Sequence, residues 1–178
     1  MEIDWKNLAA RLQGVDCEAG GSSDDARRAL ELILGEDALR ASVDHYIAAQ
    51  PGYALARSVL WQLRPWSAMS YCYEIFKGPR EIEDRRLAVE LVRVVADRRA
   101  LPWISEFLED QDLQIQAWDI GVLDQLLWSE LIEPDEAEDL LRAAGQHENE
   151  AVRERAEFIR GFLRARAEEN AQRGPNER

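Results

Sequence analysis

The residues of this chain that could do chemistry are mostly carboxylates, and they are concentrated in one segment. Residues 100–141 contain twelve Asp and Glu residues and no Lys, Arg or His, whereas the rest of the chain carries 23 acids and 22 Lys or Arg. The formal net charge of −13 therefore belongs almost entirely to this segment. Such a field attracts basic partners and repels phosphate backbones. The alternative is a solvated face that only aids solubility.

Part of the acidic segment is expected to face outward as a binding surface for a basic protein. Between 134 and 144, an apolar stripe that includes Leu140 and Leu141 leaves the neighbouring acids facing water. Tryptophan is enriched at binding hot spots, so Trp103 or Trp128 could anchor the partner. The expected surface carboxylates are Glu106, Glu109, Asp110, Asp135, Glu136, Glu138 and Asp139.

One carboxylate falls on an apolar helix face instead. Over residues 112–128, Asp119 lies in the middle of an arc of Ile, Trp, Val and Leu side chains. A lone carboxylate there would be costly, so it needs a partner. Arg155 lies in the apolar arc of the last expected helix, which predicts a buried structural pair between Asp119 and Arg155. A helix-end backbone group is the alternative partner, and a functional carboxylate in a cleft is the alternative role.

The other residue types that support catalysis or metal binding are sparse. His45 and His147 are the only histidines, and Cys17 and Cys72 are the only cysteines. They form no His-X-X-X-His or Cys-X-X-Cys spacing, so a zinc site is not expected. His147 stands at a helix start, where a capping or loop role is favoured. We expect no catalytic, cofactor-binding or metal-binding residue, and no cofactor.

The elements that must position these residues are helices. The chain lacks sustained period-2 alternation and hairpin-turn dipeptides, and Gly and Pro divide it into short segments. Ser23 before two aspartates predicts one helix cap, and Pro134 before two acids predicts another helix start. The expected helices cover residues 2–13, 24–34, 37–49, 53–63, 66–77, 80–97, 101–110, 112–128, 134–144 and 149–169.

Paired helices repeat weakly along the chain. Residues 100–127 resemble a whole HEAT repeat, with an early Pro in the first helix, an acidic turn and a longer second helix. Residues 147–163 resemble another second helix, with Val152-Arg153 where that family places Val-Arg. The resemblance implies an all-α, right-handed helical solenoid of four to five antiparallel pairs. We expect it to form a single domain over residues 1–170, followed by a polar tail at 171–178.

The chain shows no sign of a membrane segment or a secretion signal. The first expected helix carries charges within its apolar residues, and no apolar run approaches the ~20 residues that cross a bilayer. We therefore expect a cytoplasmic protein without membrane contact. Arginine outnumbers lysine 20 to 2, which by association suggests a bacterial genome.

Three functions are compatible with these features. The chain resembles small acidic helical-repeat immunity proteins of bacteria in size, charge and lack of catalytic motifs, which implies an antitoxin-like inhibitor of a basic toxin. A scaffold or regulatory adaptor is the first alternative. HEAT-like DNA glycosylases are the second, since Trp118 and Asp119 resemble their site residues, but the net charge of −13 opposes nucleic-acid binding.

Overall fold

The computed structural model describes residues 3–12 and 22–173, and every regular element in them is a helix. The all-α prediction is therefore confirmed. Cys17 and residues 174–178 of the expected tail lie outside the described residues. The elements are α1 (Trp5–Arg11), α2 (Ser23–Leu34), α3 (Glu36–Ile47), α4 (Tyr53–Leu63), α5 (Trp66–Lys77), α6 (Ile82–Val95), η1 (Arg98–Trp103), α7 (Ile104–Leu108), α8 (Leu113–Trp128), η2 (Pro134–Ala137), α9 (Glu138–Gly145) and α10 (Glu150–Arg173).

Two expected helices begin as 3₁₀ turns. The helix predicted at 101–110 is divided into η1 and α7, and Pro102 lies inside η1. The helix predicted at 134–144 begins with Pro134 in η2 before α9 continues it. Proline has no N–H to donate, and the tighter 3₁₀ geometry is common at helix ends.

The cap of α2 lies one residue earlier than predicted. Ser22, not Ser23, is the N-cap: its hydroxyl accepts from the Asp25 N–H at 3.2 Å. The Asp25 carboxylate in turn accepts from the Ser22 N–H at 2.9 Å. This reciprocal pair satisfies two helix-end donors, which a cap at Ser23 would not do with the same acid.

The contacts of the chain group it into two compact units, Met1–Val95 and Ala96–Arg178. Helix packing within each unit is compatible with helix-pair repeats. A continuous HEAT-like solenoid and a single domain over 1–170 stay predictions, and the two units are described separately below.

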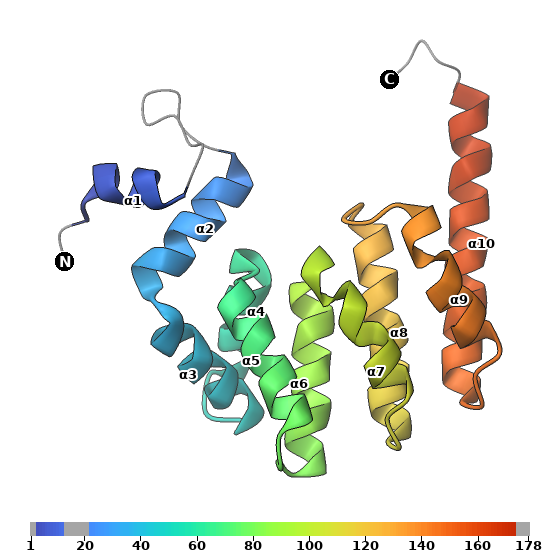
Figure 1. Cartoon of the computed structure of the whole chain (residues 1–178), viewed down its shortest axis with the longest axis horizontal. Helices are drawn as coiled ribbons and strands as arrows, with labels where there is room; N and C mark the ends of the chain where they lie inside the picture. Colours follow the sequence, from blue (N-terminus) through green and yellow to red (C-terminus); the bar gives the residue numbers. More distant parts are fainter. Residues whose placement is uncertain (1–2, 13–21, 174–178) are drawn as a thin grey trace. The chain divides into compact units, whose positions relative to one another are not determined.

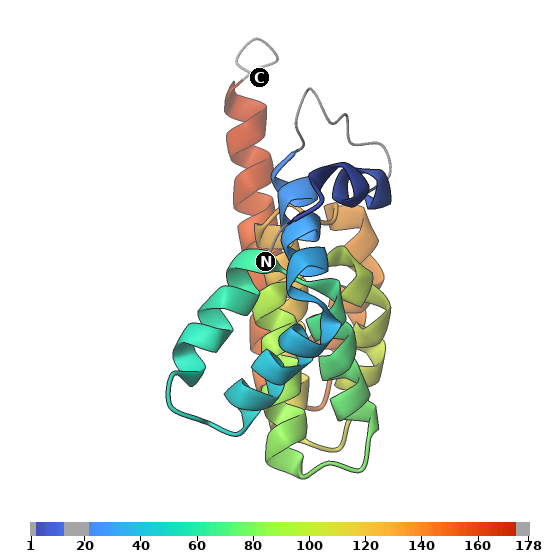
Figure 2. The ribbon, with the colours of Figure 1, turned by 90° about the vertical axis from the view of Figure 1, so that its left-hand side faces the viewer.

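The N-terminal unit packs around α3, α5 and α6. Its fully buried side chains include Val43, Met69 and Val92. Helix α4 packs on α3 and α6 and lies at the edge of the unit (Figure 2). Consequently α4 leaves the large apolar side chains Leu55 and Trp61 exposed.

The C-terminal unit is organised by α8, which packs against α7 and α10 (Figure 1). Its core contains Phe107, Ile115, Leu123 and Ile159, all without exposed surface. At 16 residues, α8 is about 24 Å long at the helical rise of 1.5 Å per residue. The turn that precedes α8 and the η2 segment that follows it therefore lie at opposite ends of the unit.

A polar network joins the two helix pairs of this unit at the start of α8. His147 Nδ1 accepts from the Asn149 N–H at 3.1 Å, so Nε2 carries the proton and donates to the Leu108 carbonyl at 3.0 Å. The Asn149 amide donates to the Leu113 carbonyl at 3.0 Å and to Gln116 Oε1 at 2.9 Å. The network fixes the α9–α10 loop against the α7–α8 turn, so His147 has the loop role expected of it.

Candidate protein-binding surface

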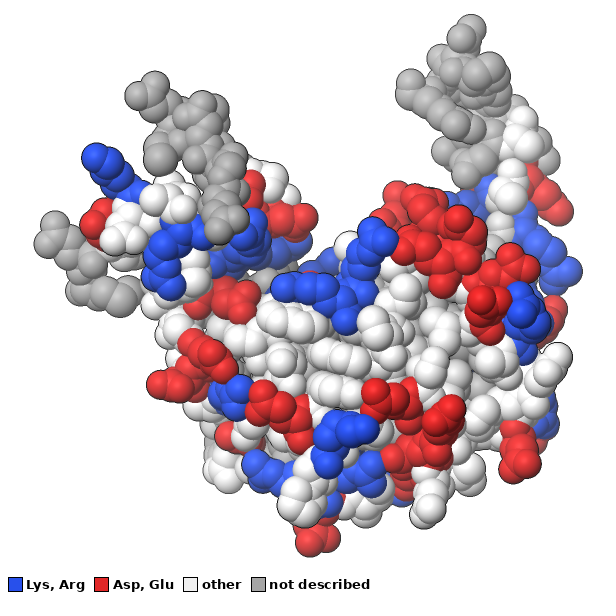
Figure 3. Space-filling model, in the orientation of Figure 1, with Lys and Arg blue, Asp and Glu red and all other residues white. Residues whose placement is uncertain are grey.

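The seven expected surface carboxylates do not form one patch. Glu109 and Asp110 lie in the turn before α8, with Glu106 one turn earlier in α7. The other four, Asp135, Glu136, Glu138 and Asp139, lie in η2 and at the start of α9, beyond the other end of α8. Figure 3 shows acidic atoms over the η2–α9 region and, separately, near the α7–α8 turn. The prediction of a single acidic surface is therefore corrected to two clusters, one toward each end of α8.

Arginines from outside the acidic segment neutralise part of it. Arg98 binds Glu136 and Arg142 binds Asp139, each at 2.6 Å. The exposed carboxylates Glu133, Asp135 and Glu138 form no ion pair with any described residue. We call these three residues the acidic end. Arginines that lie outside the segment in sequence are close to these acids in space. The negative charge around the segment is therefore smaller than the sequence alone indicates.

The two tryptophans expected as anchors differ in exposure. Trp103 is half-buried in η1, whereas Trp128, the last residue of α8, is 61% exposed. The Trp128 ring rests on Phe162 of α10, with the centroids 4.9 Å apart and the planes at 33°. An exposed indole held in place by a second ring is a preorganised anchor.

Trp128 belongs to a row of side chains along the junction of α8 and α10, which we call the seam. On α10 its members recur at helical spacing, so that they share one face. The seam consists of Asp124, Trp128 and Glu130 beside Arg155, Phe158, Phe162 and Arg166.

Two arginines of α10 form ion pairs with carboxylates within the seam. The Arg155 guanidinium lies 2.9 Å from Asp124 and 5.1 Å from the centroid of the Phe158 ring, which is 56% exposed. At the other end, Arg166 pairs with Glu130. Between these two ion pairs lies the exposed Trp128. Tryptophan offers the strongest cation–π face of any side chain.

A small hollow joins the seam to the acidic end. Its volume is about 200 Å³, and its walls include Glu130 and Arg166 from the seam and Glu133 and Pro134 from the segment leading into η2. The rest of the walls is formed by the apolar side chains Leu127, Ile132, Leu163 and Ala167. The seam and the acidic end thus form one continuous surface at the C-terminal end of α8.

The prediction that Asp119 forms a buried pair with Arg155 is wrong, and only its burial is confirmed. Asp119 has no exposed surface, as expected, but neither carboxylate oxygen has a hydrogen-bond partner in the described part of the chain. Arg155 binds Asp124 instead, with 41% of its own side chain exposed. A long arginine can keep its charge in water and meet a carboxylate there, which avoids the cost of burying the guanidinium. Burial raises the pKa of Asp119 well above its usual value.

Sequence reasoning missed a second buried carboxylate, in the N-terminal unit. Glu90 of α6 is 6% exposed and accepts a hydrogen bond from the Tyr46 hydroxyl at 2.9 Å. Arg57 and Arg93 also donate to it, at 2.8 and 3.3 Å. Burial, with Glu90 as the next cause, raises the pKa of Tyr46 to about 12. Glu90 stands within the apolar run Leu87–Val95, a signal that the helical pattern used for Asp119 could have detected.

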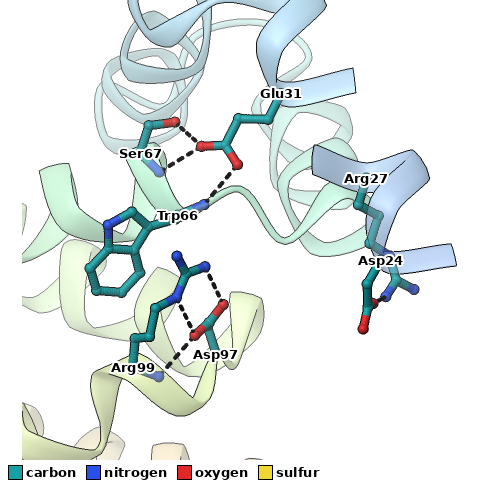
Figure 4. Close-up of polar contacts among 7 residues, drawn as sticks. All are labelled: Asp24, Arg27, Glu31, Trp66, Ser67, Asp97 and Arg99. Atoms are coloured by element: carbon teal, nitrogen blue, oxygen red, sulfur yellow. Dashed lines mark hydrogen bonds and ion pairs between the residues drawn. The ribbon is translucent and has the colours of Figure 1, made fainter. Parts of the chain in front are cut away.

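The polar contacts drawn in Figure 4 stabilise helix ends in each unit. In the N-terminal unit, the Glu31 carboxylate accepts from the Ser67 N–H at 2.9 Å and from its hydroxyl at 2.7 Å, so α2 caps the start of α5 (Figure 4). In the C-terminal unit, Asp97 caps η1 and binds Arg99 through both oxygens, at 2.9 and 2.6 Å. These two carboxylates therefore have structural roles in capping helices.

The remaining residue types with reactive potential are also accounted for. Cys72 is buried, and burial raises the pKa of its thiol, so it is not a nucleophile at neutral pH. No three His, Cys, Asp or Glu side chains of the described residues are grouped to hold a metal ion. Within residues 3–12 and 22–173, no helix combines the length and apolar character needed to cross a bilayer.

Comparison of the chain with protein-family models, with curated proteins and with solved structures found no match.

Proposed function

We propose that this protein is a non-catalytic binding domain that captures a basic protein with the seam and the acidic end. The observation that carries the proposal is the exposed Trp128, in tilted contact with Phe162 and placed between two arginines that the same surface already holds. A surface that pairs carboxylates with aromatic rings suits Arg and Lys side chains.

The charge of the C-terminal unit supports the same kind of partner. Residues 96–178 carry 20 Asp or Glu against 10 Lys or Arg, a net charge of −10, whereas residues 1–95 carry 15 against 12, a net charge of −3. Long-range attraction would bring a basic protein to the C-terminal unit, and the apolar rings of the seam would then hold it. Attraction sets the rate of association, and desolvated contacts set the lifetime.

In its most concrete form, the proposal is an immunity-like or antitoxin-like inhibitor of a basic bacterial toxin. A scaffold or adaptor would use the same surface but leave its partner active. An activity assay of the captured partner with and without this chain separates the two, because only an inhibitor lowers that activity in proportion to the complex formed.

The test is a capture experiment. The wild type and variants altered at one surface are immobilised, and the basic protein that each captures from lysate of the source cells is compared. Reversing Glu133, Asp135 and Glu138 to Lys together should abolish capture, and Trp128→Ala should shorten the lifetime of the complex. The matched control reverses Glu109, Glu148 and Glu150, three exposed acids near the other end of α8, with the same change in charge. Equal loss of capture by both triple variants would refute the surface proposed here, since only overall charge would then matter.

The alternative of a DNA glycosylase receives no support from the position of its candidate residues. Asp119 has no exposed surface, so an extruded base has no access to its carboxylate. The net charge of −10 on its unit also repels the phosphates that such an enzyme must hold.

A further inference from the structure

The buried Asp119 is not used by the proposed binding surface, yet it places a constraint on the whole C-terminal unit. It lies in the middle of α8, the helix that packs against both α7 and α10. Its side chain has no exposed surface, and both carboxylate oxygens are without a hydrogen-bond partner among the described residues. A carboxyl in such a position is tolerable only when it is neutral.

Among residues 3–12 and 22–173, no charged group compensates the ionised form of Asp119. Burial is the sole cause of its raised pKa. On α10, Arg155 is held by Asp124, and Arg160 donates to the Leu141 carbonyl at 3.1 Å. The charged side chain of α7, Glu106, is acidic and would only disfavour a second negative charge.

We propose that Asp119 is a proton-dependent lock of the C-terminal unit: α8 stays packed against α7 and α10 while the carboxyl keeps its proton, and this packing loosens when the proton is lost. Deprotonation would place an unpaired charge in the core, and the unit would relieve it by admitting water. The seam lies on α8 and α10, so the lock would also control the geometry of the binding surface.

The direction of the pH dependence follows from linkage. An aspartate whose pKa is higher in the folded than in the unfolded chain binds more protons when folded. Its stabilising contribution is full below the unfolded value near 3.9 and is lost as pH rises through the folded value.

The test compares urea unfolding of the full chain and its Asp119→Asn variant from pH 5 to pH 9, followed by helical circular dichroism. The urea midpoint of the wild type should fall relative to that of Asp119→Asn as pH rises. Only the wild type releases the Asp119 proton on unfolding, and a higher pH favours that release. Asp124→Asn is the matched control on the same helix. It loses the ion pair with Arg155, so its midpoint should be lower by a similar amount at every pH in this range.

The carboxyl carbon of Asp119, followed by nuclear magnetic resonance in the wild type, provides a measurement that does not depend on a variant that folds. It should titrate well above the range of the exposed aspartates. Titration within that ordinary range would overturn the lock, as would parallel pH profiles for the wild type and Asp119→Asn.

Discussion

Among the described residues, each unit buries one carboxylate on a central helix, and the two differ in their hydrogen-bond partners. Glu90 in the N-terminal unit receives hydrogen bonds from Tyr46, Arg57 and Arg93. Asp119 in the C-terminal unit receives none from the described residues. Glu90 is thus a buried carboxylate surrounded by three donors, whereas burial without a partner raises the pKa of Asp119 well above its usual value. Burial alone therefore does not determine whether a carboxylate stabilises or destabilises a fold. That depends on whether hydrogen-bond donors surround it.

The largest expected loss of stability comes from removing the Glu90 carboxylate. Glu90→Ala should lower the free energy of unfolding by roughly 3 kcal/mol, because two arginines and a tyrosine hydroxyl lose their shared acceptor. Chemical denaturation measures the change. Glu74→Ala, which breaks the exposed pair with Arg40 at 2.8 Å, is the control and should cost about 1 kcal/mol or less. Similar losses in both variants would show that burial of Glu90 adds nothing.

The same comparison predicts an opposite sign at Asp119. Asp119→Leu should raise the free energy of unfolding at pH 7 by about 1 kcal/mol, because it replaces an unsatisfied polar group with an apolar one of similar size. Thermal unfolding should then show a midpoint higher by about 2–4 °C for a chain of this length. A clear loss of stability would mean that Asp119 has partners that matter, and the contrast with Glu90 would disappear.

The uncharged hydrogen-bond network around Asn149 in the C-terminal unit adds a third case to this comparison. The expected change in stability is similar in size to that at Asp119. Asn149→Ala removes the bonds to Gln116 and Leu113 and the acceptor of the Ala151 N–H at 3.0 Å. We expect a loss of about 1 kcal/mol, with faster hydrogen exchange at the start of α10 than elsewhere in the unit. Uniform exchange along α10 would contradict the local role of this network.

The smallest effect on stability is expected at the binding surface. Trp128→Ala should lower the free energy of unfolding by about 1 kcal/mol or less, because the indole is mostly exposed and the change removes mainly its tilted contact with Phe162. The complex with a basic partner should nevertheless dissociate at least tenfold faster. Dissociation rates from a surface-immobilised partner test this, and an unchanged rate with intact folding would remove Trp128 from the site.

The sequence by itself determined the helical class, most helix boundaries, the concentration of acid in one segment and the burial of Asp119. These features follow from local rules: apolar periodicity, capping residues such as those around α2 and the position of proline act over a few residues. Burial of Asp119 was readable because 3.6-residue periodicity alone places it on the apolar face of α8.

Only the tertiary structure decided which charges meet. Arg155 binds Asp124 and not Asp119, Arg98 reaches Glu136 across 38 positions of sequence, and two other helices, α3 and α4, bring donors to Glu90 of α6. It also divided the acidic segment between the two ends of α8 and left Trp128, not Trp103, exposed. The physical reason is that ion pairing and exposure depend on distances set by how helices pack, and residues far apart in sequence carry no local signal of that packing.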